Sequence, residues 1–509
     1  MTTEETKQTG NAPETVVITS GEETGPFWNA SSSQFIYAPA FQFAPVPGFA
    51  RYRYAATDEQ GAVHAFVADS ASASLAPVWD SIPEGTVRLT VHALDKDGRE
   101  AYLVGARTFF RLAPFLDDLP GAVRPYGEAA SRAYLYAMSQ GFLRHWLTDA
   151  TPDPDYDLNV YPSKMISAII GAMLYYAELC PAATDDAVRI AENAADYLIG
   201  ITPQTGPMQG VPPTYQIDFR PHPETRDNLT ANARIDWTMM IYPADVGAAY
   251  LRLSAKTGKT KYYDAALAIG RHYRETVQEN GSWYLLRHRK TGEVLAPDFC
   301  EPLEKIVPFL MALCERTGDG AWKTLADRAI AYVERDKLKT YDWGAQFEDG
   351  TCSVNYSNLT HYGAAALARY YARYFPDDPA KMQIAEELMR FVEDQFVIWK
   401  RPAPWNRNGY DTSLFHTPCG LEQYGWYVPI DASTGDILTA FLALYKAGRG
   451  EVYLRKAKAL GDSLTRVQRG NGMIPTHWMN ERFVSGEAFW INCMFVSAAA
   501  LTELASLGD

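Results

Sequence analysis

The chain has 509 residues, of which 47% are hydrophobic and 21% charged, a composition typical of a well-packed globular protein. This length exceeds one ordinary core, so we expect one large domain and a smaller one. The net charge of −14 argues against nucleic acid and anionic membranes as partners. An anionic substrate would need a local group of Arg and Lys. Aromatic residues make up 13% of the chain, which suits platforms for sugar rings as well as a large core.

The sequence lacks the motifs that indicate a cofactor, an export signal or a membrane anchor. It has no phosphate loop, nucleophile elbow, zinc-ligand spacing or nucleotide fingerprint, so we expect neither cofactor nor metal. No apolar run reaches the length of a membrane span, and the polar start at residues 1–5 does not resemble a signal peptide. We therefore expect a cytoplasmic protein, or a periplasmic or secreted one if a signal peptide has been removed. The cysteines are scattered without CxxC spacing, and we expect buried free thiols: Cys180, Cys300, Cys314, Cys352, Cys419 and Cys493.

The first quarter of the chain has the pattern of short strands after a polar tail. Residues 1–30 are rich in Thr, Glu and Gly and predict a loose tail. Within 31–116, apolar and polar residues alternate, as at 87–93, and turn signals such as Asp-Lys-Asp-Gly at 95–98 separate the runs. We predict an antiparallel β-sandwich of fibronectin or immunoglobulin type that serves as a support domain. It also offers a packing surface for a homo-oligomer.

Residues 120–509 have the pattern of an all-helical domain, so the protein is predicted to be mainly α. Alternate segments are rich in small and aromatic residues, and those between them carry more charge, which indicates a repeat. An open solenoid competes with a closed ring, but long loops at 201–236, 338–357 and 399–430 favour an (α/α)6 toroid with a functional face built from loops. The expected helices lie near 126–148, 162–180, 184–200, 237–256, 260–279, 301–316, 320–337, 358–375, 380–398, 432–447, 451–469 and 485–506.

Asp236 stands where a loop gives way to one of these expected helices. On its own it is best interpreted as an N-cap residue, since caps are common and catalytic residues few. Its surroundings alter this balance: residues 234–243 read Arg-Ile-Asp-Trp-Thr-Met-Met-Ile-Tyr-Pro, and 257–264 read Thr-Gly-Lys-Thr-Lys-Tyr-Tyr-Asp. Together with the hairpin at 281–293, they resemble unsaturated glucuronyl and rhamnogalacturonyl hydrolases. The resemblance implies that Asp236 is the catalytic acid/base.

The resemblance covers mainly residues 160–320 and then departs from the family pattern. Those families usually have Arg-Gly-x-Gly-Trp before the next ring helix, whereas residues 299–305 read Phe-Cys-Glu-Pro-Leu-Glu-Lys. Because this motif contributes to substrate binding, its change opens the possibility of a different substrate. Saturated uronides, which β-glucuronidases on the same toroid cleave, become at least as well supported as unsaturated ones.

Glycoside hydrolysis needs a proton donor and a second carboxylate that acts as base or nucleophile. Asp236 is the first candidate, and the resemblance gives it the proton-donor role. The partner is left open among Glu301, Glu304, Glu348 and Glu422, with Glu301 and Glu304 preferred because they stand where the family pattern changes. Each of these carboxylates is, taken singly, more often a solvated or capping residue.

A uronate-binding pocket also needs a group that holds the sugar carboxylate, and a bidentate Arg is the physical choice. Loop residues with aromatic or polar side chains would form the rest of the pocket. The candidates for substrate binding are Arg234, Trp237, Tyr242, Trp343, Glu348, His361, Trp405, Arg407, Tyr410, His416 and Glu422.

These residues predict a hydrolase that removes a terminal uronic acid, with a β-glucuronidase first and an unsaturated uronyl hydrolase second. A polysaccharide lyase is an alternative, in which Tyr356 or Tyr362 would abstract a proton with help from His361 and Asn355. A glycan-binding protein without catalytic activity is a third. In each case the expected partner is a carbohydrate.

Overall fold

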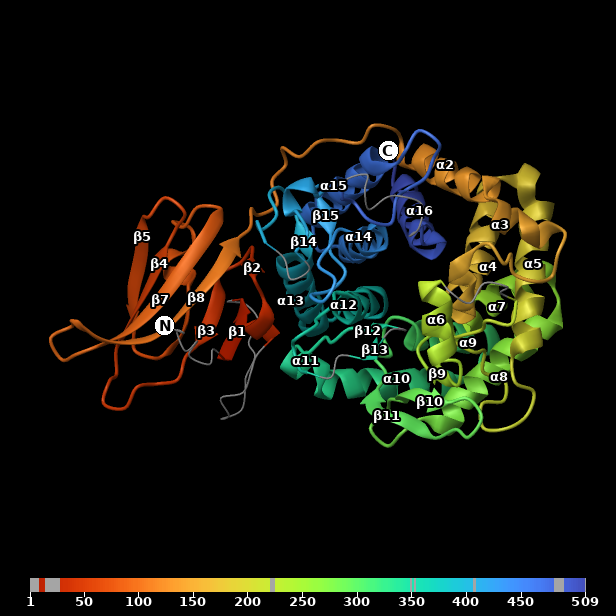
Figure 1. Ribbon diagram of the computed structural model, residues 1–509, viewed down its shortest axis with the longest axis horizontal. Helices are drawn as coiled ribbons and strands as arrows, with labels where there is room; N and C mark the ends of the chain where they lie inside the picture. The colour runs from red at the N-terminus through yellow and green to blue at the C-terminus, as the bar shows by residue number, and fades with distance from the viewer. Residues whose placement is uncertain are drawn as a thin grey trace.

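The computed structural model describes residues 9–13, 28–219, 225–347, 350–351, 354–405, 409–479 and 489–508. Figure 1 shows a β region on one side of the molecule and a ring of helices on the other. The protein is mostly helical, and the β region precedes the helical domain, as predicted.

The β region contains two sheets whose inward-facing residues share one core. β7 alternates buried and more exposed residues along most of its length, as a strand with one covered face does. Phe41 of one sheet packs against Phe35 and Phe109 of the other, with ring centroids 5.8 Å apart in both pairs. The larger sheet has the order β2 (Gln34–Phe35), β8 (Glu100–Arg111), β7 (Gly85–Leu94), β4 (Tyr52–Thr57) and β5 (Val63–Ala68), and the smaller has the order β1 (Thr9–Pro13), β3 (Pro39–Gln42) and β6 (Ser72–Ser74).

Two details of the β region differ from the prediction. Thr9–Pro13, expected in the loose tail, pairs with β3 as strand β1. β2 runs parallel to β8, whereas the other pairs are antiparallel. A two-residue strand carries too little alternation to reveal its direction in the sequence. The immunoglobulin or fibronectin assignment stays a prediction.

The long helices follow the predicted pattern and pack as six hairpins. Each expected helical segment contains one of them, because their apolar stripes are long and strongly periodic. The pairs are α2 (Tyr126–Ser139) with α16 (Ile491–Ala505), α4 (Pro162–Leu179) with α5 (Thr184–Ile201), α7 (Pro243–Thr257) with α8 (Thr260–Thr276), α9 (Ile306–Thr317) with α10 (Gly320–Arg335), α12 (Tyr362–Tyr374) with α13 (Pro379–Phe396), and α14 (Asp431–Lys446) with α15 (Glu451–Val467).

The ring closes because the last helix returns to the first ones. α16 packs against α2, α4 and α14, and α4 continues the inner ring to α7 and α9. On the other side α14 packs against α12. Figure 1 shows these inner helices surrounding the centre of the domain. Gly435 and Gly461 permit close contacts in this ring, since a β-carbon at 461 would meet Leu504 and one at 435 would lie 3.2 Å from Ser497 Cα.

Short elements fill the long loops between the hairpins. They include α3 (Gly141–Arg144), α6 (Arg226–Ala233), α11 (Lys337–Thr340), β9 (Trp237–Met239), β10 (Tyr284–His288), β11 (Val294–Phe299), β12 (Gln346–Phe347), β13 (Gly350–Thr351), β14 (Val397–Ile398) and β15 (Cys419–Gly420). The short helix α1 (Ala76–Trp79) lies in the β region.

The helix expected from residue 237 begins instead at Pro243. Trp237–Met239 forms β9, which pairs with β10 through Met239 and Leu286. Pro243 is suited to the first turn of a helix, where its missing N–H costs nothing. The interpretation of Asp236 as the N-cap of this helix is therefore wrong.

Buried carboxylates join the β region to the outer face of α13. The Oδ1 atom of Asp394 accepts hydrogen bonds from the backbone N–H groups of Ile36 at 2.6 Å and Tyr37 at 2.8 Å. Next to it, Glu393 accepts hydrogen bonds from the Tyr37 hydroxyl at 2.8 Å and from the Trp399 indole at 3.0 Å. Burial raises the pKa of Asp394 to about 7. The two parts of the protein are thus connected by directional bonds in a region without solvent.

We expect Asp394→Ala to lower the free energy of unfolding by about 2–4 kcal/mol, because it leaves two buried N–H groups without an acceptor. Denaturant unfolding with the wild type as reference measures this loss. Asp118→Ala is the control, since Asp118 forms an ion pair with Lys400 at 3.0 Å but its side chain is 69% exposed. That exposed pair contributes less than about 1 kcal/mol. Equal effects of the two variants would contradict the prediction.

Candidate functional site

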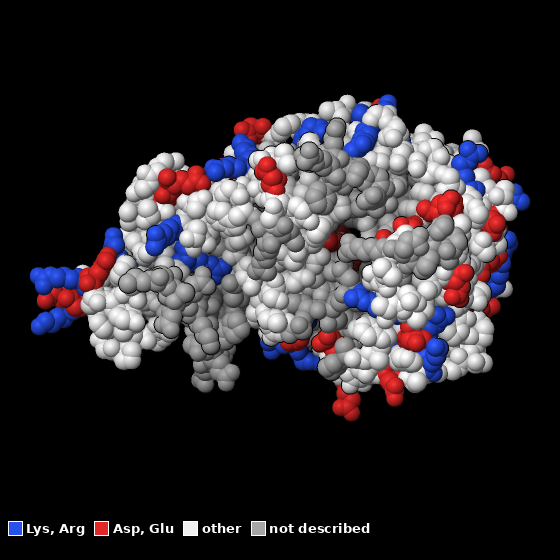
Figure 2. Space-filling model, viewed as in Figure 1, with Lys and Arg blue, Asp and Glu red and all other residues white. Residues whose placement is uncertain are grey.

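A cavity lies between the beginnings of α9 and α12, on the face of the ring built from loops. It encloses about 400 Å³, part of it open to solvent. Figure 2 shows the hollow on this face of the helical domain, with acidic residues beside it. The described residues that line the cavity are Ile241, Glu301, Glu304, Lys305, Trp343, Gly344, Gln346, Thr360, Tyr362 and Gly363.

Glu301 lies in the wall of this cavity, in the loop before α9. Its backbone N–H donates to Gln346 Oε1 at 2.7 Å, and its Oε1 atom accepts from the Leu303 N–H at 3.0 Å. The carboxyl group packs against Gly363, where an added β-carbon would lie 3.2 Å from Glu301 Cδ. Burial raises the pKa of Glu301 to about 7, although the bond from Leu303 opposes the shift. Glu301 can therefore carry a proton near neutral pH.

Glu304 is in a different electrostatic environment. Its Oε1 atom lies 3.0 Å from the Lys305 amino group, which is also 3.0 Å from Asp245 Oδ2. Burial lowers the pKa of Lys305, but the charges of Asp245 and Glu304 outweigh burial and raise it. Asp245 lies in the first turn of α7, so the ion pair joins the α7 and α9 entrances.

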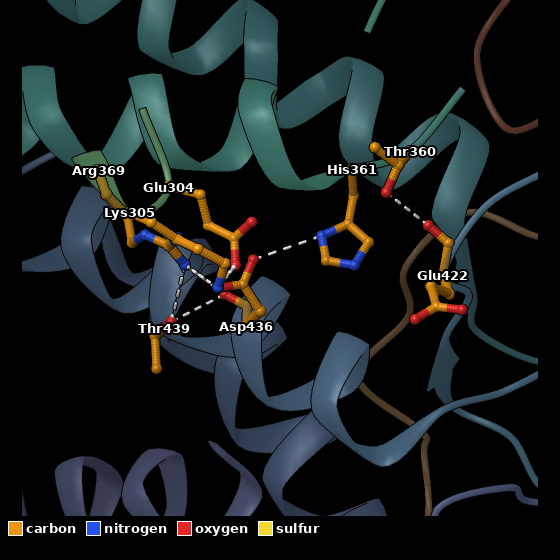
Figure 3. Close-up of polar contacts among 8 residues, drawn as sticks. All are labelled: Glu304, Lys305, Thr360, His361, Arg369, Glu422, Asp436 and Thr439. Carbon is orange, nitrogen blue, oxygen red and sulfur yellow. Dashed lines mark hydrogen bonds and ion pairs between the residues drawn. The ribbon is translucent and has the colours of Figure 1, made fainter. Parts of the chain in front are cut away.

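A second ion-paired group lies behind the cavity wall. His361 Nδ1 is 3.4 Å from Asp436 Oδ2, and Arg369 forms an ion pair with the same carboxylate. Burial raises the pKa of Asp436, but the charge of Arg369 and the contact with His361 lower it to about 2. Figure 3 shows this group beside the Lys305–Glu304 pair. His361 itself is fully buried and is not among the described residues that line the cavity, so its ring has no open face toward solvent.

Tyr362 exposes part of its side chain to the cavity at the start of α12. Burial raises the pKa of its hydroxyl well above the usual value, and the charges of Glu422 and Glu304 add to the effect. The Tyr362 hydroxyl is therefore a hydrogen-bond donor near neutral pH and is poorly suited to act as a base. Thr360, two residues before Tyr362, donates from its hydroxyl to the Glu422 carbonyl at 2.8 Å (Figure 3).

Asp236 lies just before β9, whereas Glu301 and Glu304 lie in the loop before α9. Asp236 is not among the described residues that line the cavity, and its Oδ1 atom lies 2.9 Å from Lys290 Nζ. A hydrogen bond from Lys290 lowers its pKa. Trp237 belongs to β9 and lies opposite His288, in the same small sheet. Arg234 directly precedes this segment and is also absent from the described lining.

The other predicted binding residues divide between the cavity and more distant positions. Trp343 lines the cavity and is 1% exposed, and Tyr242 lies 5.7 Å from Lys305 Nζ. Trp405 packs against Phe110 of the β region, with centroids 6.1 Å apart. Farther along the same long loop, Tyr410 packs edge-on against Trp426, and the backbone N–H of His416 donates to the Trp478 carbonyl. Glu348 and Arg407 lie outside the described residues.

Sequence reasoning missed Asp245 and Lys305. Two signals were present: a carboxylate two residues after the helix-starting Pro243, and a lysine directly after Glu304. Neither pattern is specific, because acidic residues are common in first helical turns. Only the meeting of α7 and α9 brings the two side chains together.

Two features are absent from the described residues: a cluster of metal-binding side chains and a helix that could cross a membrane. No group of three or more His, Cys, Asp and Glu side chains in this part of the chain is placed to hold a metal ion. No helix in the described ranges is long and apolar enough to cross a membrane. Cys300 and Cys419 are buried free thiols.

No protein-family model and no curated protein matches the sequence. Among solved structures, the chain is similar to cellobiose 2-epimerase from Spirochaeta thermophila, with 12% identity, 77% of this chain and 100% of that chain covered, and a TM-score of 0.51. It is also similar to a family 76 glycoside hydrolase from a bovine Bacteroides thetaiotaomicron strain, with 9% identity, coverage of 94% and 98%, and a TM-score of 0.48.

A third similar structure is the unsaturated glucuronyl hydrolase from Streptococcus agalactiae, with 12% identity, 74% of this chain and 92% of that chain covered, and a TM-score of 0.47. The resemblance to six-hairpin (α/α)6 proteins is thereby confirmed at the level of the fold. At these identities the likeness concerns the fold alone.

The raised pKa of Glu301 makes stability depend on pH. Between the ordinary carboxyl pKa of 4.5 and about 7, the folded protein holds a proton that the unfolded chain has released. The free energy of unfolding should therefore fall as pH rises through this window, by at most about 1.4 kcal/mol per pH unit for this group. We expect the difference between the wild type and Glu301→Gln, measured by denaturant unfolding, to change between pH 5 and pH 7 and to level off above. A constant difference would contradict the assignment.

Proposed function

We propose that the protein is a glycoside hydrolase that uses Glu301 as general acid and Glu304 as general base or nucleophile. The observation that supports this is the difference between two carboxyl groups at one cavity: Glu301 has its pKa raised to about 7, and Glu304 is paired with Lys305 at 3.0 Å. Carboxyl groups whose environments favour opposite protonation states can divide the acid and base roles.

The reaction proceeds in two transfers at the bond between the terminal sugar and its leaving group. Glu301 protonates the leaving oxygen as the glycosidic bond breaks, and Glu304 either removes a proton from the attacking water or attacks the anomeric carbon itself. In the second case a water molecule deprotonated by Glu301 then hydrolyses the glycosyl ester and frees Glu304. Lys305 holds the Glu304 carboxyl group in an ion pair at 3.0 Å. Trp343 and Tyr362 contribute an apolar wall and a hydroxyl donor to the sugar-binding surface.

The sequence resemblance favours a terminal uronic acid as the sugar removed, with β-glucuronides first and unsaturated uronides second. The same resemblance gives the acid role to Asp236, but its ion pair with the exposed Lys290 supports that role less than burial supports it for Glu301. The alternative of a lyase is weaker, because burial raises the pKa of Tyr356 to about 12 and that of Tyr362 even further. A tyrosinate base would be rare in either position at neutral pH.

We expect Glu301→Gln and Glu304→Gln each to lower kcat/KM by about 10²–10⁴-fold, because each removes a proton-transfer group. The measurement is nitrophenol release from a panel of nitrophenyl hexosides and uronides, supplemented by absorbance of unsaturated products on an intact polyuronide. Glu279→Gln is the control, since Glu279 is exposed on the loop after α8.

Asp236→Asn distinguishes the two assignments of the acid. If it abolishes turnover while Glu301→Gln does not, Glu301 is not the acid. An absorbance increase from the polyuronide without nitrophenol release would favour a lyase. If the wild type binds sugars but cleaves none of the substrates, the protein is a glycan-binding module and the hydrolase proposal fails.

A general acid with a pKa of about 7 should also determine the alkaline limit of activity. We expect kcat/KM to fall tenfold per pH unit above about pH 7, because the deprotonated Glu301 cannot protonate the leaving group. A pH–rate profile tests this. A substrate with a highly acidic leaving group, which needs little protonation, should show a smaller decline; an equal decline for both substrates would argue against Glu301 as the acid.

A further inference from the structure

We propose that Asp245 determines the charge of the sugar that the cavity accepts, by neutralising Lys305 and so favouring an uncharged sugar over a uronate. This inference rests on the hydrolase chemistry of the proposed function and replaces the terminal uronic acid with an uncharged sugar as the substrate class. It departs from the uronic-acid specificity that the sequence resemblance favours.

The first step in the argument is the position of Lys305. It is the cationic residue among the described ones that line the cavity, and 19% of its side chain is exposed. A sugar carboxylate that entered the cavity would need such a group as its partner. Its amino group, however, already lies 3.0 Å from Asp245 Oδ2 and 3.0 Å from Glu304 Oε1 (Figure 3 shows the contact with Glu304).

The second step is the balance of charge around this contact. Two carboxylates surround one ammonium group, and Glu301 adds a third carboxyl that ionises at about pH 7. Of the described lining residues, Glu304 is acidic, Lys305 is basic, and Glu301 becomes a second carboxylate above about pH 7; Asp245 adds a negative charge next to Lys305, although it is not part of the described lining. An entering carboxylate would be repelled by these groups and would have to displace one of them from Lys305. Each of these costs weakens the binding of a uronate in a partly buried site.

The third step concerns the other cations near the cavity. Arg369 is ion-paired with Asp436 and also donates to Thr439 Oγ1 at 3.2 Å (Figure 3). The charge of Lys164 also acts on Asp245, but its amino group lies over the Trp490 ring at 4.5 Å. Neither Arg369 nor Lys164 belongs to the described lining. The described cavity thus presents hydroxyl, amide and carboxyl groups, which suit sugar hydroxyls.

Asp245 is the residue of this group that can be changed without removing a proposed catalytic group. It lies in the first turn of α7, and its contact with Lys305 crosses from one ring helix to the entrance of the next. Asp245→Asn keeps the shape of the side chain and removes its charge. Lys305 then retains a single carboxylate partner and becomes available to an anionic sugar.

The test compares kcat/KM for the nitrophenyl hexoside that the wild type cleaves best with kcat/KM for the uronide of the same configuration. We expect the wild type to prefer the hexoside by at least about tenfold, and Asp245→Asn to shift this ratio toward the uronide by about tenfold or more. A ratio of two substrates on one enzyme removes any common loss from altered folding or from altered Glu304. Asp245→Glu should restore the wild-type ratio.

Asp196→Asn is the matched control, since Asp196 is paired with Lys261 at 2.6 Å on the exposed surface, and it should leave the ratio unchanged. A wild type that prefers the uronide, or an unchanged ratio in Asp245→Asn, would overturn the inference while leaving the hydrolase proposal intact. Titration calorimetry with the free hexose and the free uronic acid provides the separate readout. If no substrate is cleaved, the hydrolase proposal fails, and selective binding of the hexose, reversed in Asp245→Asn, still supports the charge selection.

Discussion

Closure of the helical ring is the constraint on which the rest of this structure depends. α16 comes from the end of the chain and packs against α2 and α4 from the beginning of the helical domain. This contact gives the apolar stripes of the inner helices a common interior. Ile169, Leu310, Leu438 and Leu501 lie in this interior and are fully buried. A ring also fixes the directions of its members, so that loops far apart in sequence meet on one face. The cavity is a consequence of this meeting.

The polar chemistry of the cavity comes from the entrances of successive inner helices. Asp245 lies in the first turn of α7, Glu301 and Glu304 precede α9, and Tyr362 begins α12. The positive ends of the helices favour acidic groups in these positions. The groups at these helix entrances affect one another in different ways. Burial penalises the charge of Glu301 and so raises its pKa, whereas Lys305 has two carboxylate partners that stabilise its charge. Differences in burial and pairing between close neighbours allow acid and base roles within one short loop.

The β region comes first in the chain but contacts ring helices that come late in it. Its strand β2 and the residues after it are held by α13, where Glu393 and Asp394 are buried together with Gln395. Lys456 of α15 lies over the rings of Phe441 and Tyr453 and pairs with Glu393. These directional contacts suit a support domain, since hydrogen bonds fix orientation more strictly than apolar packing does. They also stabilise α13 and α15 against each other on the outside of the ring.

The sequence by itself determined most strands of the β region, the long helices and their grouping, because apolar periodicity of two or 3.6 is a local property of the chain. It also singled out Glu301, Glu304 and Trp343. Tertiary structure alone decided that Trp237–Met239 forms a strand, since its partner Leu286 lies more than forty residues away in the chain. It likewise separated Asp236, paired with Lys290, from the cavity, and brought Asp245 to Lys305. Ion pairs and pKa shifts arise from contacts between helices, and no spacing along the chain encodes them.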